Sequence, residues 1–202
     1  MLSKSKQRGV SLIELMVGIT IVGILFMLAA PSYRTWIQNQ QIRAGAESIL
    51  NGIRLARSSA LNNNASARFV LCDVNDTPPT SSWEVLAASA TAVAPTASLA
   101  CAAGSNPGSN AAAGDIRVQE RSGQEGSKFA QVAVLPIGAT TVTFNSLGRV
   151  VNLNAGGSAP LAQINVSNPA GDRPLQINLW PGGNTKMCDP SPLLAANDPR
   201  HC

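Results

Sequence analysis

The sequence predicts an α+β protein, in which one long N-terminal helix packs on an antiparallel β-sheet domain. An apolar run over residues 10–30 passes into a segment, up to Asn64, whose apolar residues recur at steps of three and four. Short runs rich in valine, isoleucine, threonine and aromatic residues follow, bounded by turn-forming residues. Aromatic residues make up 4% and charged residues 13% of the 202 residues. This composition is typical of a β-rich exported module with many turns, not of a helical enzyme.

The first predicted element is an apolar helix over residues 10–30, which carries a single charged residue, Glu14. At roughly 1.5 Å per residue the helix is about 31 Å long, which is enough to cross the hydrocarbon core of a bilayer. Lys4, Lys6 and Arg8 precede it, so the positive-inside rule leaves the N-terminus in the cytoplasm. The rest of the chain is therefore expected outside the cytoplasm.

A cleaved secretory signal is the alternative interpretation of this run. Such signals have an apolar core of about 7–15 residues, which is shorter than the run observed. Pro31 also follows the small residues Ala29 and Ala30 directly, and a proline at that place disfavours ordinary signal cleavage. We therefore prefer the membrane-spanning interpretation.

The second predicted element is an amphipathic helix that continues from the first and ends near Asn64 in a turn-favouring run of asparagines. Pro31 lacks a backbone N–H, so it should kink the junction and not end the helix, provided that neighbouring groups satisfy the freed carbonyl. Tyr33 and Trp36 lie just beyond the apolar run and are candidate anchors at the membrane interface. Core or subunit packing is an equal alternative for both.

The remaining segments predict short β-strands, because β-branched and aromatic residues cluster between turn signals. Asn145–Gly148 reads as a hairpin turn between two of them. The uncharged segment 87–114 predicts an exposed, loosely ordered loop, with a partner-binding surface as the alternative. The candidate strands are 67–72, 83–86, 116–119, 132–135, 141–144, 149–153, 162–166 and 174–180.

Four widely spaced cysteines, none of them in a CxxC pair, indicate disulfides in an exported domain and not a zinc site. Three pairings are possible. We prefer the sequential one, Cys72 with Cys101 and Cys188 with Cys202, because each bond would close a loop that lacks strong structure of its own.

The sequence offers little material for catalysis. His201, the penultimate residue, is the one histidine, so a histidine-based triad or metal centre lacks its usual members. No nucleophile-elbow, P-loop or dinucleotide-binding pattern occurs. We therefore predict no enzyme activity, no cofactor and no metal. The net charge of +4 comes largely from Lys4, Lys6 and Arg8, so it does not indicate a nucleic-acid surface.

The residues around Glu14 carry a resemblance to a known family. Residues 8–15, Arg-Gly-Val-Ser-Leu-Ile-Glu-Leu, closely resemble the type IV prepilin leader. The resemblance implies that a prepilin peptidase cuts after Gly9 and that Val10, where phenylalanine is usual, becomes the N-methylated N-terminus. It also implies that Glu14 pairs with the terminal amine of a neighbouring subunit. A carboxylate buried in a membrane helix needs such a cation; snorkelling of Glu14 to the interface is the alternative.

Three further segments narrow the resemblance to the GspH/FimT family of minor pilins and pseudopilins. Residues 53–60 resemble its LARSEA stretch, residues 143–149 its F-x-x-x-G-R element, and residues 183–190 its closing glycine, basic residue and cysteine motif. The family implies a type IV pilin-like fold. Its expected parts are a leader peptide over 1–9, a transmembrane and filament-core helix over 10–30, an amphipathic helix over 31–64 and a β-rich globular domain over 65–202.

The resemblance implies three candidate functions, of which we favour a minor pilin that acts in type IV pilus assembly or initiation, or in a tip complex, and hence in motility or adhesion. Its partners would be other pilins, through the N-terminal helix, the prepilin peptidase and the inner membrane. It would start as a single-pass inner-membrane protein with a periplasmic domain and then enter the extracellular filament. A pseudopilin of a type II secretion system shares the same N-terminal chemistry.

The third candidate function is DNA capture during natural transformation. FimT-like relatives bind DNA through arginines in a C-terminal Gly-Arg-x-Arg-x-Cys element, at whose arginine positions this chain has Asn184 and Lys186. Lys186 and Arg173 are the candidate DNA contacts. Aspartates lie near both in the sequence, so a solvated surface is the preferred interpretation, and DNA is not the favoured partner.

Overall fold

The computed structural model describes residues 11–72, 80–88, 115–154, 157–195 and 197–202. Within these described ranges one helix, α1 (Leu12–Asn63), is followed by β-strands only. Ser11 caps its N-terminus, where the Ser11 hydroxyl accepts a hydrogen bond from the Glu14 backbone N–H at 3.2 Å. Asn64 caps the other end in the left-handed conformation, with φ of 49°. The helix therefore ends in the asparagine run, as the sequence predicts.

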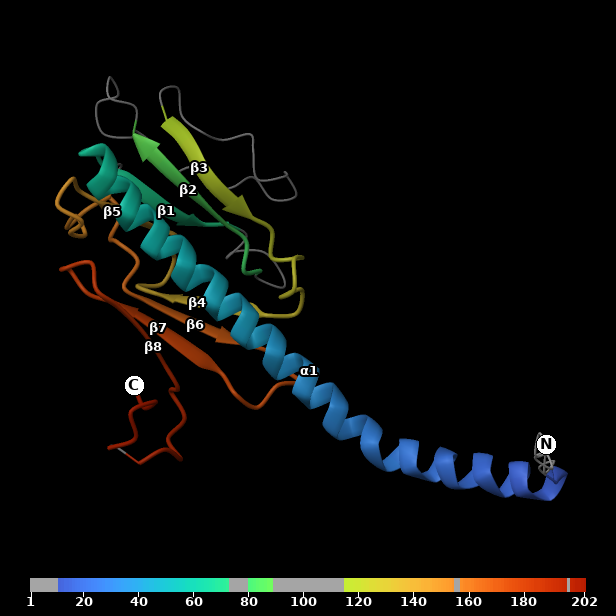
Figure 1. The fold of residues 1–202 in the computed structure, drawn as a ribbon. Helices are drawn as coiled ribbons and strands as arrows, with labels where there is room; N and C mark the ends of the chain where they lie inside the picture. Colours follow the sequence, from blue (N-terminus) through green and yellow to red (C-terminus); the bar gives the residue numbers. More distant parts are fainter. Residues whose placement is uncertain (1–10, 73–79, 89–114, 155–156, 196) are drawn as a thin grey trace, which may run out of the picture.

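The helix is bent where the sequence predicts a kink. The axis of Leu12–Met27 makes an angle of 45° with that of Ser32–Asn63, and Pro31 lies between the two stretches. The N-terminal stretch projects away from the rest of the molecule, whereas the C-terminal stretch lies along the face of the β-strands (Figure 1). One continuous helix thus serves two different parts of the molecule.

The strands of the described residues form two antiparallel four-stranded sheets, with the orders β3-β2-β1-β5 and β4-β6-β7-β8. The fold class predicted from the sequence is confirmed, although the strand pattern did not indicate that the strands divide between two sheets. The strands are β1 (Ala67–Leu71), β2 (Trp83–Ala88), β3 (Asp115–Arg121), β4 (Gln131–Leu135), β5 (Thr141–Phe144), β6 (Gln163–Ser167), β7 (Leu175–Leu179) and β8 (Thr185–Cys188).

One hydrophobic core lies between α1 and both sheets. The helix contributes Ile42, Ile49 and Ile53, which are buried at steps of seven and four along one face. Phe69 of β1 and Trp83 of β2 pack beneath it, with ring centroids 5.8 Å apart and ring planes tilted by 36°. The second sheet adds side chains that include Ile164, Val166 and Ile177. The helix therefore joins the two sheets into one domain.

Polar contacts fasten α1 to the sheets at successive heights. The base of the domain is the end from which the N-terminal stretch of α1 projects. Near this base, Asn39 Nδ2 donates to Asp172 Oδ1 at 2.7 Å, and the Asp172 backbone N–H donates back to Asn39 Oδ1 at 3.1 Å. In the buried middle, Trp83 Nε1 donates to Ser48 Oγ at 2.8 Å. Near the far end, Arg57 donates to backbone carbonyls of two turns. These bonds fix the position of the helix along the domain.

Two strand predictions differ from the structure. Residues 149–153 do not form a strand, because the Val150 backbone N–H donates to the Pro181 carbonyl and the Val151 N–H donates to the Thr143 carbonyl. Only an isolated bridge joins Val150 to Phe144. Strand β8 was not predicted, since its sequence lacks an apolar alternation. Most of the predicted loop over 87–114 lies outside the described residues.

Candidate assembly site

The N-terminal stretch of α1 presents apolar side chains to the surroundings on every side. From Leu12 to Met27 all the large apolar side chains are 51–82% exposed. The Thr20 hydroxyl is satisfied within the helix, since it donates to the Met16 carbonyl at 2.5 Å. Exposed apolar surface of this size is unstable in water and needs a lipid phase or other protein surfaces to cover it.

Glu14 is the charged residue of this stretch and lies in the first turn of α1. The helix dipole favours an acid at this end, and Ser11 and Glu14 have the spacing of a capping box. Within the described part of the chain, no ion pair or side-chain hydrogen bond of the Glu14 carboxylate is found. The predicted processing residues, Gly9 and Val10, lie outside the described residues.

The described residues contain no single straight helix that is long and apolar enough for a membrane span. Leu12–Met27 and Ser32–Asn63 meet the length and composition of a span only when taken together as a bent pair. The predicted span begins at Val10, outside the described residues.

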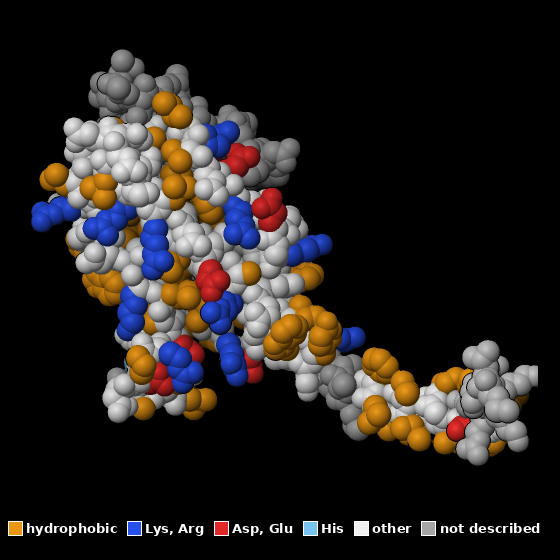
Figure 2. Space-filling view, viewed as in Figure 1, with side chains coloured by type: hydrophobic (Ala, Val, Ile, Leu, Met, Phe, Trp, Pro, Cys, Tyr) orange, Lys and Arg blue, Asp and Glu red, His pale blue; other side chains and the backbone are white. Residues whose placement is uncertain are grey.

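The surface of the globular domain differs in character from that of the projecting helix. Lysine and arginine side chains are spread over its visible face, with aspartate and glutamate beside several of them, whereas the side chains on the visible side of the projecting helix are mostly apolar (orange in Figure 2). Arg43, for example, pairs with Glu47 at 2.7 Å. The contrast separates an apolar projecting helix from a domain whose visible face carries many charged side chains.

The three segments that resemble family motifs come together at the far end of α1. Arg57, from the helix, donates from Nε to the Gly148 carbonyl at 3.1 Å and from Nη2 to the Gly182 carbonyl at 3.4 Å. Gly148 ends the predicted turn and has φ of +69°, a conformation that favours glycine. Asn145 Oδ1 closes that turn by accepting from the Leu147 and Arg149 backbone N–H groups, both at 3.0 Å. Arg57 therefore links a turn of each sheet to the helix.

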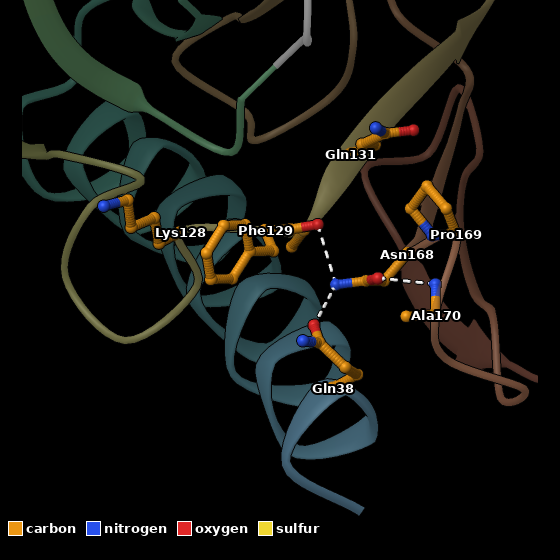
Figure 3. A pocket seen from close by; sticks show the side chains of 8 residues that line it. Gln38, Lys128, Phe129, Gln131, Asn168, Pro169 and Ala170 are labelled. Carbon is orange, nitrogen blue, oxygen red and sulfur yellow. Dashed lines mark hydrogen bonds between the residues drawn. The ribbon is translucent and has the colours of Figure 1, made fainter. Parts of the chain in front are cut away.

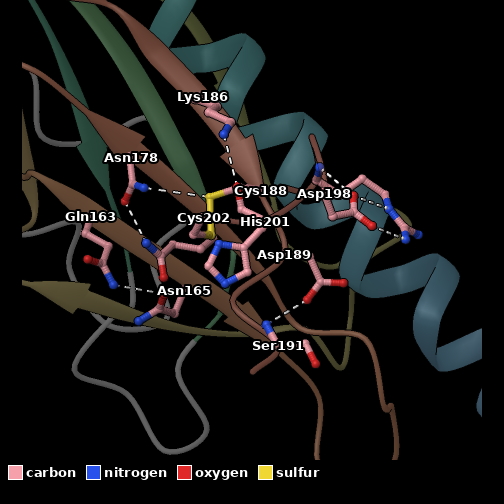
Figure 4. The surroundings of a disulfide bond; sticks show 12 residues. Gln163, Asn165, Asn178, Lys186, Cys188, Asp189, Ser191, Asp198, His201 and Cys202 are labelled. Carbon is pink, nitrogen blue, oxygen red and sulfur yellow. Dashed lines mark hydrogen bonds and ion pairs between the residues drawn. A yellow bond between two sulfur atoms is a disulfide. The ribbon is translucent and has the colours of Figure 1, made fainter. Parts of the chain in front are cut away.

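The C-terminal residues form a disulfide-closed loop next to β8 (Figure 4). Cys188 and Cys202 are bonded, with Cα atoms 5.0 Å apart, as in the preferred pairing. Asp189 and His201 form a parallel bridge. Cys72 is also disulfide-bonded, and Cys101, its predicted partner, lies outside the described residues. The loop thus returns the chain end to the edge of the second sheet.

The two candidate DNA contacts lie in different hollows of the surface. Lys186 is exposed on β8, donates to the His201 carbonyl at 3.0 Å, and lines a hollow with Arg54. Arg173 lines another hollow with Arg43 and Arg200. Sequence reasoning missed Arg54, because its nearness to Lys186 depends on how α1 packs beside β8.

The ion pairs around the Arg173 hollow reduce its positive charge. Arg200 binds Asp198 through Nε at 3.1 Å and Nη2 at 2.8 Å. Hydrogen bonds from Arg200 lower the pKa of Asp198 to about 2. The Asp198 carboxylate is therefore ionised at neutral pH and offsets the charge of Arg200.

A helix that is exposed at one end and packed on antiparallel sheets at the other defines a pilin-like subunit. Residues 4–30 match the prokaryotic N-terminal methylation motif, and residues 45–183 match the family described as type II transport protein GspH. The chain therefore belongs to the GspH/FimT family of type IV minor pilins and pseudopilins, and the predicted family is confirmed.

Individual relatives cover only part of this chain. It is 29% identical over 91 residues to a type IV major fimbrial protein FimA of Dichelobacter nodosus, and 37% identical over 62 residues to a second protein of that description. The alignments cover 37% and 31% of this chain, and 56% and 38% of the length of those relatives. The type IV minor pilin FimU of Pseudomonas aeruginosa is similar with a TM-score of 0.45 and 14% identity, over 75% of this chain and 91% of that one.

Proposed function

We propose that this protein is a minor pilin subunit of a type IV pilus, which is cut between Gly9 and Val10 and assembles through its N-terminal helix. The observation that carries the proposal is the apolar stretch Leu12–Met27, which is exposed throughout and has one charged residue, Glu14. Before assembly the stretch lies in the inner membrane with the globular domain in the periplasm. In the filament, helices of neighbouring subunits cover it.

The Glu14 carboxylate supplies the specificity of this packing. Inside a bundle of apolar helices an unpaired carboxylate is costly, and an amine at the same depth removes that cost. Cleavage after Gly9 creates such an amine at Val10. The pair therefore favours one axial position of each subunit relative to its neighbour.

The test compares Glu14→Ala with Glu47→Ala, a matched control on the same helix. We expect Glu14→Ala to remain in the membrane fraction but to be missing from sheared pili. Glu47→Ala, which loses only an exposed pair with Arg43, should enter pili normally. Normal incorporation of Glu14→Ala would contradict the pairing.

Processing is tested separately with Gly9→Glu, and Ser11→Ala serves as the control. Gly9→Glu should keep the leader, so its intact mass should exceed that of the processed chain by the mass of residues 1–9, with glutamate at position 9, less the methyl group that only the processed chain carries. Ser11→Ala should be cut normally, because only the helix cap is lost. A processed Gly9→Glu chain would refute the cleavage site.

A pseudopilin of a type II secretion system is the second candidate, which the description of the matched GspH family supports. The exposed helix and Glu14 serve both systems equally. The genes beside this one discriminate between them, because other minor pilin genes indicate a pilus and secretion genes indicate the pseudopilin.

DNA capture ranks below both, although Lys186 and Arg54 share one exposed hollow. Glu47 lines the same hollow, and the ion pairs near Arg173 leave little excess positive charge. We expect the full chain in detergent to retard duplex DNA weakly at physiological salt. Tight, steeply salt-dependent retardation that is lost in Lys186→Ala, but kept in Lys128→Ala, would reverse this ranking.

A further inference from the structure

We propose that the base of the globular domain carries a girdle for docking on the membrane surface, formed by Tyr33, Trp36, Lys128 and Phe129. Its partner is the headgroup layer of an anionic bilayer. The inference rests on the membrane-anchored state proposed above and adds a second point of contact with the bilayer, beyond the apolar stretch Leu12–Met27.

The first side of the girdle comes from α1 itself. Tyr33 is 62% exposed and Trp36 is 57% exposed, although both lie on a helix whose next turns are buried in the core. Their rings stack with centroids 6.0 Å apart and an angle of 25° between planes. Arg34, between them in sequence, is also exposed. These residues form an aromatic and cationic surface that nothing in the described part of the domain covers.

The second side comes from the segment between β3 and β4. Phe129 is 53% exposed, and Lys128 Nζ lies 5.7 Å from the centroid of its ring. Phe129 is held in place through Asn168, whose Nδ2 donates to the Phe129 carbonyl at 2.9 Å and also to Gln38 Oε1 (Figure 3). Gln38, Lys128, Phe129 and Asn168 line a hollow of about 260 Å³.

The two sides lie at similar heights and on opposite sides of the helix. Gln38 follows Trp36 by two residues, which corresponds to a rotation of about 200° and a rise of about 3 Å. Trp36 therefore points away from the side on which Asn168 fastens Phe129 to the helix. Aromatic and cationic groups therefore lie on two sides of α1 where the helix enters the globular domain.

The height of the girdle matches the headgroup layer. Trp36 lies five residues beyond Pro31, and with a bend of 45° its height above the bend is about 5 Å. The polar layer on each side of a bilayer is about 5–7 Å thick. Tyrosine and tryptophan concentrate at that depth, and lysine and arginine are attracted to anionic lipids there. The girdle thus continues directly from the apolar stretch that enters the bilayer.

The test uses depth-dependent quenching of tryptophan fluorescence by brominated lipids. The full chain is reconstituted in vesicles of phosphatidylcholine and phosphatidylglycerol, with bromine either near the headgroup or deep in the acyl chain. Trp83 is 2% exposed in the core and gives a constant background. In a Trp180→Phe chain the remaining signal therefore reports on Trp36, and in a Trp36→Phe chain it reports on Trp180.

Trp180 is a matched control, because it lies next to the turn that Arg57 contacts, about 28 Å further along the helix than Gln38. We expect shallow bromine to remove most of the Trp36 emission and to leave Trp180 unchanged. The substitution Phe129→Trp, in a chain with Trp36→Phe and Trp180→Phe, should be quenched like Trp36. Adding Lys128→Glu should reduce that quenching, whereas adding Lys186→Glu should not.

Insertion of the apolar stretch Leu12–Met27 is measured separately with Phe26→Trp, in a chain that also carries Trp36→Phe and Trp180→Phe. Bromine deep in the acyl chain should quench this tryptophan. If this position is quenched but the Phe129→Trp position is not, the domain stands clear of the bilayer and the girdle is refuted while the anchor survives. If Phe26→Trp is not quenched, membrane anchoring itself fails. If Trp36 is protected only after assembly into filaments, a neighbouring subunit covers it, and the girdle is likewise refuted.

Discussion

The two halves of α1 carry similar side chains in opposite surroundings. In Leu12–Met27 the large apolar side chains are mostly exposed, whereas Ile42, Ile49 and Ile53 are at most 1% exposed. Burial of one such side chain contributes about 1.5–3 kcal/mol. The second half has already gained this free energy within its own chain, and the first half gains it only from lipid or other subunits. The helix thus buries its apolar side chains within its own domain at one end and leaves them exposed at the other.

The largest effect should come from truncating an apolar side chain in each half. Ile53→Ala should lower the free energy of unfolding of the globular domain by about 2–5 kcal/mol, because it opens a cavity between α1 and the sheets. Ile19→Ala should change it by less than about 0.5 kcal/mol. Urea titration of the full chain in detergent measures both. A comparable loss in Ile19→Ala would mean that the first half packs on the domain.

Glycines sharpen the same comparison. A Cβ on Gly52 would lie 2.7 Å from Phe69 Cε2 and 3.0 Å from two Trp83 ring atoms, whereas one on Gly18 would meet nothing within 4 Å. Gly52→Ala should therefore destabilise the domain by about 1–3 kcal/mol. Gly18→Ala should leave its stability unchanged and strengthen the helix locally by up to about 1 kcal/mol. Thermal unfolding of both variants measures these effects. Equal melting temperatures for Gly52→Ala and Gly18→Ala would contradict the packing around Gly52.

Arg57 tests how the second half is joined to the two sheets. Arg57→Ala removes the donors to the Gly148 and Gly182 carbonyls and should cost about 1–3 kcal/mol. Arg54 lies three residues before Arg57 on the same helix and is exposed, so Arg54→Ala should lower the free energy of unfolding by less than about 0.5 kcal/mol. Hydrogen exchange should show faster exchange in the turns at 145–149 and 180–184 for Arg57→Ala only. Unchanged exchange there would show that the turns hold without the arginine.

The smallest effect should be the acid sensitivity of the C-terminal loop. The pKa of Asp198 is lowered from 3.8 to about 2 by hydrogen bonds from Arg200. The contribution of the ionised carboxylate is therefore complete above about pH 4 and is lost as the pH falls through about 2. Exchange of the Arg200 backbone N–H, which donates to Asp198 Oδ1, should become faster relative to the core in that interval. Asp198→Asn should remove this pH dependence.

Local patterns in the sequence predicted the elements well. The three- and four-residue apolar steps predicted that α1 continues to the asparagine run, where Asn64 adopts the left-handed cap. The predicted segment 141–144 coincides with β5, and the other predicted strands, except 149–153, overlap observed ones. These features succeed because they depend on neighbours within a few residues. Recognition of the family likewise depended on short motifs.

The relations between distant segments were not predictable in the same way. Arg57 contacts carbonyls that are 91 and 125 residues away in sequence, and no local pattern indicates such a contact. The same holds for Phe129, which Asn168 joins to the helix from 39 residues away. The division into two sheets depends on which strands pair with each other. The alternation of side chains within a strand does not indicate this. The roles of Gly9, Val10 and Glu14 stay predictions, because they concern other chains.

The successive fastenings of α1 have a mechanical consequence. A pull on the N-terminal half enters the domain along the Ser32–Asn63 axis and loads the bonds at Asn39, Ser48 and Arg57 side by side. Bonds loaded in shear share the force and break together, whereas bonds that are peeled break in turn at a lower force. The 45° bend turns part of an axial pull sideways, so the bond from Asn168 to Gln38 and the reciprocal Asn39–Asp172 pair bear the first of the peeling load. The contacts along α1 thus resist a pull along the helix axis together, and the contacts nearest the bend resist its sideways component.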